Sequence, residues 1–320
     1  MRKGMRMEVF SNAASMMATL FIVVALGYAA RKGGLVNDDF DAMLSKVVIW
    51  ITCPALILDS VLGNGNLPDN TIIWQVLGVT LLLFIPTTLL ALLITHFYRT
   101  PENAKSAHAF TIVFSNVAFI GFAVSSAILG KESLLYLSVY NLVCTTYIWS
   151  LGAWLMSRSG TVKLTRREQF AYVRKNLCTP TIAACLAALV LALLHITDSG
   201  IIGYTCNLLG AMTPPATMLI IGSTLAKYRM REMVTDVWSY ITAFIRLIAM
   251  PAFVYFFGGL FISDTYVLAT LALISAMPAA QVGIMMAVAY GGDLLTVSRG
   301  MFLTTLLSII TIPIVTMFIV

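Results

Sequence analysis

The sequence predicts an all-α polytopic membrane protein. Hydrophobic residues make up 59% of the 320 positions and charged residues only 11%, compared with about 45–50% and about 25% in soluble domains. The mean hydropathy is +0.91. Apolar runs long enough to cross a hydrocarbon core of ~30 Å recur along the whole chain, without the ~10-residue alternating segments of a β-barrel. We therefore expect one integrated membrane domain.

Ten membrane helices are expected. Apolar runs of about 20 residues must be helical, because each unpaired backbone amide in lipid costs several kcal/mol. We do not expect the first apolar run to be a cleavable signal peptide. It is longer than the roughly 7–15 apolar residues of such a peptide, and it ends at Arg31 and Lys32, where a small-residue cleavage site should be. The expected helices cover residues 8–30, 40–62, 71–97, 106–129, 133–156, 176–196, 201–226, 234–259, 265–290 and 296–319.

The chain divides into two halves of five helices, residues 1–157 and residues 176–320, joined by a basic linker over residues 158–175. An odd number of helices per half requires the second half to insert upside down. Prolines and glycines recur in the same order at a nearly constant offset: Pro54 with Pro215, Pro86 with Pro251, and Gly121 and Gly130 with Gly283 and Gly292. We therefore predict two inverted five-helix repeats, a common architecture of secondary transporters.

Basic residues predict the orientation in the membrane. Six basic residues lie between Arg158 and Asn176, and basic short loops mark the cytoplasm. The loops in phase with this linker carry Arg31, Lys32, Arg99, Lys105, Lys227, Arg229 and Arg231. We therefore expect a cytoplasmic linker and two extracytoplasmic termini in a bacterial inner membrane, although the short N-terminal cluster of basic residues favours the opposite. The net charge of +6 then reflects topology and lipid contact rather than nucleic-acid binding.

Two hydrophobic segments, one in each half, are interrupted where a membrane helix should be continuous. They are FSNVAFIGFAVSSAILG from Phe114 and SAMPAAQVGIMMAVAYGG from Ser275. Pro278 lacks an N–H group and disfavours a helical residue before it, while Ser115 and Asn116 can bond to the backbone and unwind the helix beside Gly121. Each break creates a helix N-terminus near mid-membrane, with free N–H groups and a partial positive charge. Such paired breaks predict a carrier, and their chemistry predicts an anionic substrate.

Particular side chains are expected to bind this anion. Asn116 is expected to donate to a substrate carboxylate. Gln281, about one turn past Pro278, is its expected counterpart in the second half. The alternative is that both amides only bridge helices. The predicted substrate-binding set is Asn116, Ser115, Gly121, Pro278, Gln281, Asn141 and Arg246, and the predicted structural breaks lie at Pro54, Pro215 and Pro278.

Arg246 is the charge that the predicted spans explain least well. A charge at the centre of a membrane helix costs at least ~2.5 kcal/mol unless it pairs. Arg246 would either neutralise the substrate or, as we prefer, form an ion pair with Asp293 or Asp59. Tyr140 and Tyr147, on the same helix as Asn141, are further candidates to line the cavity, with packing as the alternative role.

Catalytic and metal-binding patterns are lacking in the sequence. The five cysteines include no CxxC pair, the three histidines are scattered, and GNGN from Gly63 lacks the spacing of a phosphate-binding loop. His108 is a weak candidate for a proton role. We therefore expect no enzyme activity, no metal and no cofactor. Because no ATPase motif is present, transport would use a gradient, and coupling to H⁺ or Na⁺ is left open.

Several motifs resemble the auxin efflux carrier family. They are CPALIL in the second expected helix, SNVAFIGFA in the fourth, MPAAQVG in the ninth, and AYGGD followed by TTLLSIITIPI in the tenth. The resemblance covers the whole chain. It implies ten helices in two inverted repeats, a scaffold and a transport region, and a crossover of the fourth and ninth helices where substrate binds. Val288 and the Ser115–Asn116 pair depart from the pattern of bacterial relatives.

The expected function is secondary active or facilitative transport of a small organic anion by alternating access. Candidate substrates are a dicarboxylate such as malate or malonate, or an auxin-like carboxylate. A bile-acid-type sodium symporter is an alternative within transport, and a membrane sensor or enzyme is an alternative outside it. Membrane lipids are the other expected partners, and a homodimer is left open.

Overall fold

The computed structural model describes residues 2–63, 67–162, 165–197 and 200–319. The end of the predicted GNGN turn, residues 64–66, and residues 163–164 of the linker lie outside this part. Regular structure in the described residues is helical, apart from one isolated bridge between Ser115 and Ala279. The predicted all-helical class is therefore confirmed.

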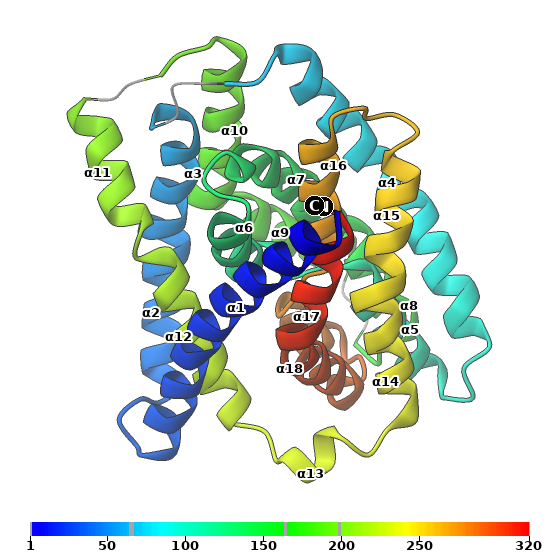
Figure 1. Ribbon diagram of the computed structural model, residues 1–320. Coiled ribbons are helices and arrows are strands. Elements are labelled where there is room, and N and C mark those ends of the chain that lie inside the picture. The colour runs from blue at the N-terminus through cyan, green and yellow to red at the C-terminus, as the bar shows by residue number, and fades with distance from the viewer. Residues whose placement is uncertain (1, 64–66, 163–164, 198–199, 320) are drawn as a thin grey trace.

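Eighteen α-helices and four π-helical turns are found in the described residues (Figure 1). The α-helices are α1 (Arg2–Lys32), α2 (Asp38–Val47), α3 (Cys53–Leu62), α4 (Asn70–His96), α5 (Glu102–Val113), α6 (Phe122–Ile128), α7 (Ser133–Tyr147), α8 (Ala153–Ser159), α9 (Arg166–Leu177), α10 (Pro180–Leu193), α11 (Ile201–Gly210), α12 (Thr213–Ala226), α13 (Met230–Met233), α14 (Val237–Phe244), α15 (Met250–Gly258), α16 (Thr265–Ser275), α17 (Val282–Tyr290) and α18 (Leu294–Ile319). The π-helical turns are η1 (Val48–Thr52), η2 (Val117–Gly121), η3 (Ile148–Gly152) and η4 (Ile245–Ala249).

Seven helical segments of the described chain are long and apolar enough to cross a membrane: Phe10–Lys32, Asp38–Leu62, Asn70–His96, Ser133–Ser159, Ile201–Ala226, Val237–Gly258 and Leu294–Ile319. Three shorter apolar helices are Val117–Ile128, Pro180–Leu193 and Thr265–Ser275. Two of these three, Val117–Ile128 and Thr265–Ser275, lie within the expected helices over residues 106–129 and 265–290, which contain the predicted interruptions. The chain is thus a polytopic membrane protein.

Prolines explain several irregularities within these segments. Pro54 and Pro251 each lie two residues after a π-helical turn, η1 and η4, where the wider turn accommodates a residue that cannot donate to the preceding turn. Pro215 follows a non-helical step at Ala211–Met212, which divides one expected helix into α11 and α12. Pro54 therefore marks a π-helical turn, while Pro215 lies just beyond an interruption of the helix.

The basic linker contains a helix, α9, that we did not predict. Its N-cap is Thr165, whose hydroxyl accepts from the N–H of Glu168, while the Glu168 carboxylate accepts from the N–H of Thr165 at 2.8 Å. This reciprocal pair is a capping box, and the Thr-x-x-Glu pattern is visible in the sequence.

Helices α1, α2, α3, α10, α11 and α12 form one body, in which α12 packs along α1, and α10 and α11 pack against α3. Figure 1 shows α1, α2, α3, α11 and α12 on one side of the molecule and α4, α14 and α15 on the other. Glycines allow α1 and α12 to approach closely: a Cβ on Gly222 would collide with the carbonyl of Val24, and one on Gly27 with that of Leu219. Small residues let membrane helices approach closely, so we interpret this body as rigid.

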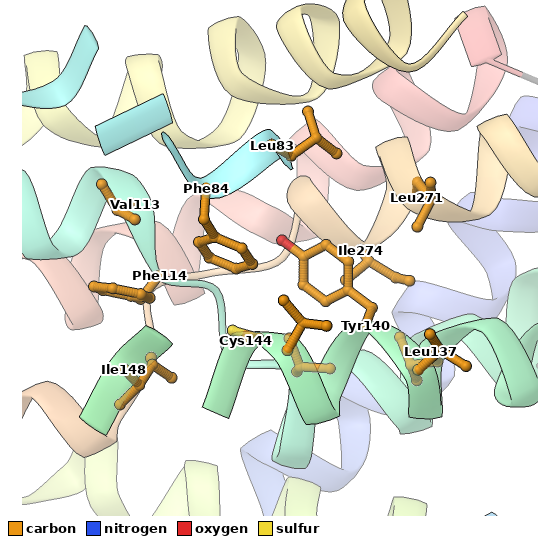
Figure 2. Packing of buried hydrophobic residues seen from close by; sticks show 14 of the residues in the cluster. Leu83, Phe84, Val113, Phe114, Leu137, Tyr140, Cys144, Ile148, Leu271 and Ile274 are labelled. Carbon is orange, nitrogen blue, oxygen red and sulfur yellow. The ribbon is translucent and has the colours of Figure 1, made fainter. Parts of the chain in front are cut away.

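The second body contains the interrupted segments. Here α4 packs on α5 and α7, α16 packs on α7, α15 and α18, and α5 packs on α8 and α18. Figure 2 shows the rings of Phe84, Phe114 and Tyr140 gathered in its interior, with the Tyr140 hydroxyl directed toward Leu83 and Phe84. The ring centroids of Phe84 and Phe114 are 5.9 Å apart. Because Phe114 lies in the first interruption, this aromatic core fixes the position of the break.

The start of the linker is attached to the second body. The N–H groups of Thr161 and Val162 donate to the carbonyls of Gly291 (3.1 Å) and Tyr290 (3.1 Å) at the end of α17. Gly291 has a left-handed φ of +66° and Thr161 lies against the position of its missing side chain, so glycine is required there. Residues 158–162 therefore belong structurally to the second body.

Candidate functional site

The two interrupted segments cross each other through their extended residues. The N–H of Asn116 donates to the carbonyl of Pro278 at 2.7 Å, and the N–H of Ala280 donates to that of Phe114 at 3.0 Å. These bonds form the antiparallel bridge between Ser115 and Ala279. The hydroxyl of Thr304 on α18 accepts from the N–H of Ala279 at 3.0 Å. The crossover is thus held by backbone bonds that a continuous helix would not make.

Two helical segments, η2–α6 and α17, have their N-termini at this crossover. The N–H groups of Ala118, Gln281 and Val282 have no backbone or side-chain acceptor among the described residues. All three residues line the same cavity. Unpaired N–H groups at a helix start carry a partial positive charge and bind anions.

Asn116 is the N-cap of η2. Its side-chain oxygen accepts from the N–H of Phe119 at 3.3 Å, which leaves its NH₂ group as a donor. Within the described residues this NH₂ group has no protein acceptor, and Asn116, although buried, lines the cavity. Gln281 is the half-buried N-cap of α17, and its side chain makes no capping bond. The two amides therefore lie at the starts of the two half-helices.

The cavity has a volume of about 530 Å³ and extends from the crossover to the ends of α2 and α12. A volume of this size is typical of pockets for small organic ligands. Its walls are mostly apolar and include Val117, Phe119, Ile148, Ile220 and Met285. Ser115 and Asn141, both buried, also line it, and the Asn141 NH₂ lies 3.7 Å from the sulfur of Cys185.

Charged residues lie at the far end of this cavity. Lys227 contacts Asp38 at 2.6 Å and Asp41 at 3.0 Å, and Arg31 contacts the same carboxylates at 2.8 and 3.4 Å. Burial alone would lower the pKa of Lys227, but the two aspartates raise it above its ordinary value, so the ammonium stays charged at neutral pH. The two positive and two negative charges balance, so the attraction for an anion comes from the crossover.

Arg246 is not placed as we predicted. It is buried, and it donates from Nη1 to the carbonyls of Ile112 (2.8 Å) and Val113 (3.2 Å) and from Nε to that of Met277 (3.1 Å). The predicted ion pair with Asp293 or Asp59 is therefore wrong. Asp293 instead accepts from Thr296, and Asp59 from Lys131 and Asn207. Arg246 also does not line the cavity.

The other predicted residues fall into two groups. Gly121 and Pro278 shape the crossover without lining the cavity: Gly121 lies buried at the end of η2, and Pro278 accepts the bond from Asn116. Tyr140 and Tyr147 do not line the cavity either, since Tyr140 packs in the aromatic core and Tyr147 donates to the carbonyl of Leu81. His108 bonds to Thr242 outside the cavity.

An ionic contact joins the two bodies at the other end of the molecule. Asp59 on α3 is buried, and it accepts from Lys131 at 3.0 Å and from Asn207 on α11 at 3.1 Å. Lys131 lies in the turn between α6 and α7. This contact therefore joins the first body to the second at the end remote from Asp38 and Lys227.

Known proteins with similar sequences are membrane transporters. The family model described as membrane transport protein, which represents the auxin efflux carrier family, matches residues 13–316. The chain belongs to this family. An uncharacterized transporter of Methanothermobacter thermautotrophicus is 25% identical over 320 residues, covering 95% of this chain and 98% of the relative. An uncharacterized transporter of Methanocaldococcus jannaschii is 20% identical over 300 residues, covering 92% and 94%.

This membrane transporter has site residues that sequence reasoning missed. Asp38, Asp41 and Lys227 line the cavity, and Thr304 supports the crossover. Asp41 could have been found in the sequence, because it is a carboxylate close to the start of an apolar run. Thr304 could not, because hydroxyl residues are ordinary in membrane helices. In the described residues, no three His, Cys, Asp or Glu side chains lie close enough to hold a metal ion.

Proposed function

We propose that this transporter is a secondary carrier of a small organic anion, whose carboxylate binds at the crossover. The observation that carries the proposal is the convergence of three unpaired N–H groups and the Asn116 NH₂ on one cavity. Helix N-termini of broken helices aimed at a mid-membrane site are the anion receptors of several carrier folds. A carboxylate can accept several such bonds at once.

The cavity walls refine the substrate class. Most of the surface that lines the cavity is apolar, although hydroxyl residues such as Thr179, Thr181 and Thr224 contribute to it. Such a surface favours a carboxylate attached to an apolar body, such as an indole-like acid. A compact dicarboxylate such as malate would leave its second carboxylate facing this wall or reaching toward Lys227. Burying a charge against an apolar wall is costly, so the monocarboxylate is the better candidate.

We infer an architecture of ten spans in two inverted repeats. In this order the two interrupted segments, α5 with η2–α6 and α16 with α17, would be the fourth and ninth spans. With a cytoplasmic linker and extracytoplasmic termini, the cavity end at Asp38, Thr179 and Lys227 faces the cytoplasm. The described conformation is then the inward-facing state of an alternating-access cycle.

This orientation predicts the labelling of a native cysteine. Cys178, which follows the linker helix α9, is exposed, whereas the other four cysteines are buried. An impermeant maleimide should therefore label the protein in inside-out vesicles but not in intact cells, with a Cys178→Ser variant as the blank. Labelling of Cys178 from outside intact cells would reverse the topology.

A sodium symporter of the bile-acid type is the second candidate within transport. Such a symporter needs carboxylate and amide oxygens arranged around the breaks. At this crossover the nearby side-chain oxygens belong to Asn116, Gln281 and hydroxyl residues, and the Asn116 oxygen is occupied by Phe119 N–H. The uncoupled or anion-exchanging carrier therefore fits the site better, and a sensor has no feature of the described chain in its favour.

A thermal-shift screen tests the proposed function. Purified protein should be melted with a panel of carboxylic acids, each paired with its uncharged amide. We expect an apolar monocarboxylate to raise the melting temperature and its amide to have no effect, because a ligand at 100 times its Kd stabilises the folded state by about 2.7 kcal/mol. A panel in which only amides, amines or sugars stabilise the protein would contradict an anion carrier.

A further inference from the structure

Arg246 lies where two half-helices end. Helix α5 ends at Val113 and α16 ends at Ser275, and the guanidinium donates to carbonyls of both segments, those of Ile112, Val113 and Met277. The end of each helix carries about half a negative elementary charge. One buried cation thus faces two negative helix ends.

The guanidinium has no acidic partner in the described part of the chain. Its contacts there are carbonyl oxygens, and Asp59 and Asp293 are engaged elsewhere. An uncompensated buried charge is strongly destabilising, so the helix ends must supply the compensating negative potential. Arg246 lies within the π-helical turn η4, and turns of this type occur frequently at functional sites.

Two of the five N–H donors of the guanidinium, those of Nη2, are open. Nη2 is buried and has no protein partner in the described residues. A void of about 10 Å³ lies beside Arg246, lined also by Thr87, Tyr140 and Ser275. This is room for a single water, and the Tyr140 side of the void is the aromatic core shown in Figure 2. The void cannot hold an organic acid.

Carbonyls at the ends of broken helices are where carriers coordinate coupling cations. We propose that Arg246 is a built-in cation, which occupies the carbonyl-lined side of the crossover permanently and makes a mobile Na⁺ or K⁺ unnecessary there. The opposite, N–H-lined side is left for the substrate anion. The consequence for transport, independence from a cation gradient, rests on the proposed function, but the cation site itself does not.

The test replaces the fixed cation with soluble ones. The proteins are the full-length wild type, Arg246→Ala, Arg246→Gln and Arg246→Lys. The control is Arg299→Ala, which removes an arginine that donates to Glu232 and Thr235 away from the crossover. Each is melted in choline chloride and again with sodium, potassium or guanidinium chloride added at about 10 mM and constant chloride.

We expect the wild type, Arg246→Lys and Arg299→Ala to melt at a temperature that does not depend on the cation. Arg246→Ala and Arg246→Gln should melt several degrees lower in choline and regain part of this loss with guanidinium or sodium. A saturable rise of the wild-type melting temperature with sodium would overturn the proposal, and so would cation-independent melting of both neutral variants. If Arg246→Ala does not fold, the cation dependence of Arg246→Gln melting decides the test.

The samples contain no organic acid. Failure of this proposal is therefore distinguishable from failure of the proposed function, which the acid screen tests.

Discussion

Replacing Asn116 with Ala is expected to weaken binding of the substrate acid by about 1.5–3 kcal/mol, the usual worth of a hydrogen bond to a charged group. This corresponds to a loss in affinity of about 10- to 150-fold. The physical reason is that the Asn116 NH₂ is the side-chain donor that accompanies the free N–H groups at the start of η2. Isothermal titration with the acid found by the screen measures the change.

The structure separates two roles of this side chain. The oxygen of Asn116 caps η2 through Phe119 N–H, so Asn116→Ala also loses a cap worth about 0.5–2 kcal/mol of stability. Asn116→Ser keeps a capping oxygen but has no NH₂ group, so it should lose affinity while its melting temperature holds. Asn70→Ala, which removes an exposed amide bonded to Leu193, is the matched control. Wild-type affinity in Asn116→Ser would show that this amide is only a cap.

Neutralising Asp59 is expected to weaken the contact between the two bodies at the end remote from Asp38 and Lys227. Asp59 joins the two bodies through Lys131, and it is buried, whereas the Lys131 side chain is 55% exposed. Exposure of one partner reduces the worth of an ion pair, so we expect a shift of about 1–2 kcal/mol, or about 5- to 30-fold in the conformational equilibrium. The shift should favour the state with the cavity open opposite the linker.

A cysteine in the cavity wall reports this shift. Met285 lines the cavity and is exposed to it, so Met285→Cys in a variant lacking the native cysteines can be labelled from either side of the membrane. Asp59→Asn should raise the rate of labelling from outside intact cells, whereas Glu132→Gln, which removes an exposed charge at the same end, should not. An unchanged rate in Asp59→Asn would show that the ion pair does not restrain opening.

Much of the fold could be predicted because the bilayer imposes strict rules on backbone bonding. Apolar runs had to be helices, and the two interruptions could be placed because Pro278 cannot donate and Asn116 can cap a new helix start. The local effects of these residues on the backbone could therefore be predicted from the sequence. The helix α9 could also have been predicted, from Thr165 and Glu168, but we treated the basic stretch as a loop.

The partner of Arg246 could not be predicted because its bonds are to backbone carbonyls. A side-chain pattern indicates where another charge might pair, and Asp59 and Asp293 were the available carboxylates. The sequence contains no sign that α5 and α16 would end side by side and expose unpaired carbonyls, which is a property of their packing. Packing also explains why Tyr140 does not line the cavity: its ring lies against Phe84, which in turn stacks on Phe114.

The most direct test of the central claim is an experimental structure of the protein with the acid from the screen bound. We predict density for the acid in the crossover cavity, with its carboxylate within hydrogen-bond distance of the Asn116 NH₂ and of at least one N–H group of Ala118, Gln281 or Val282. The apolar part of the acid should lie against Phe119 and Ile148. Density at any other place, or a carboxylate bound to Arg246, would contradict the account.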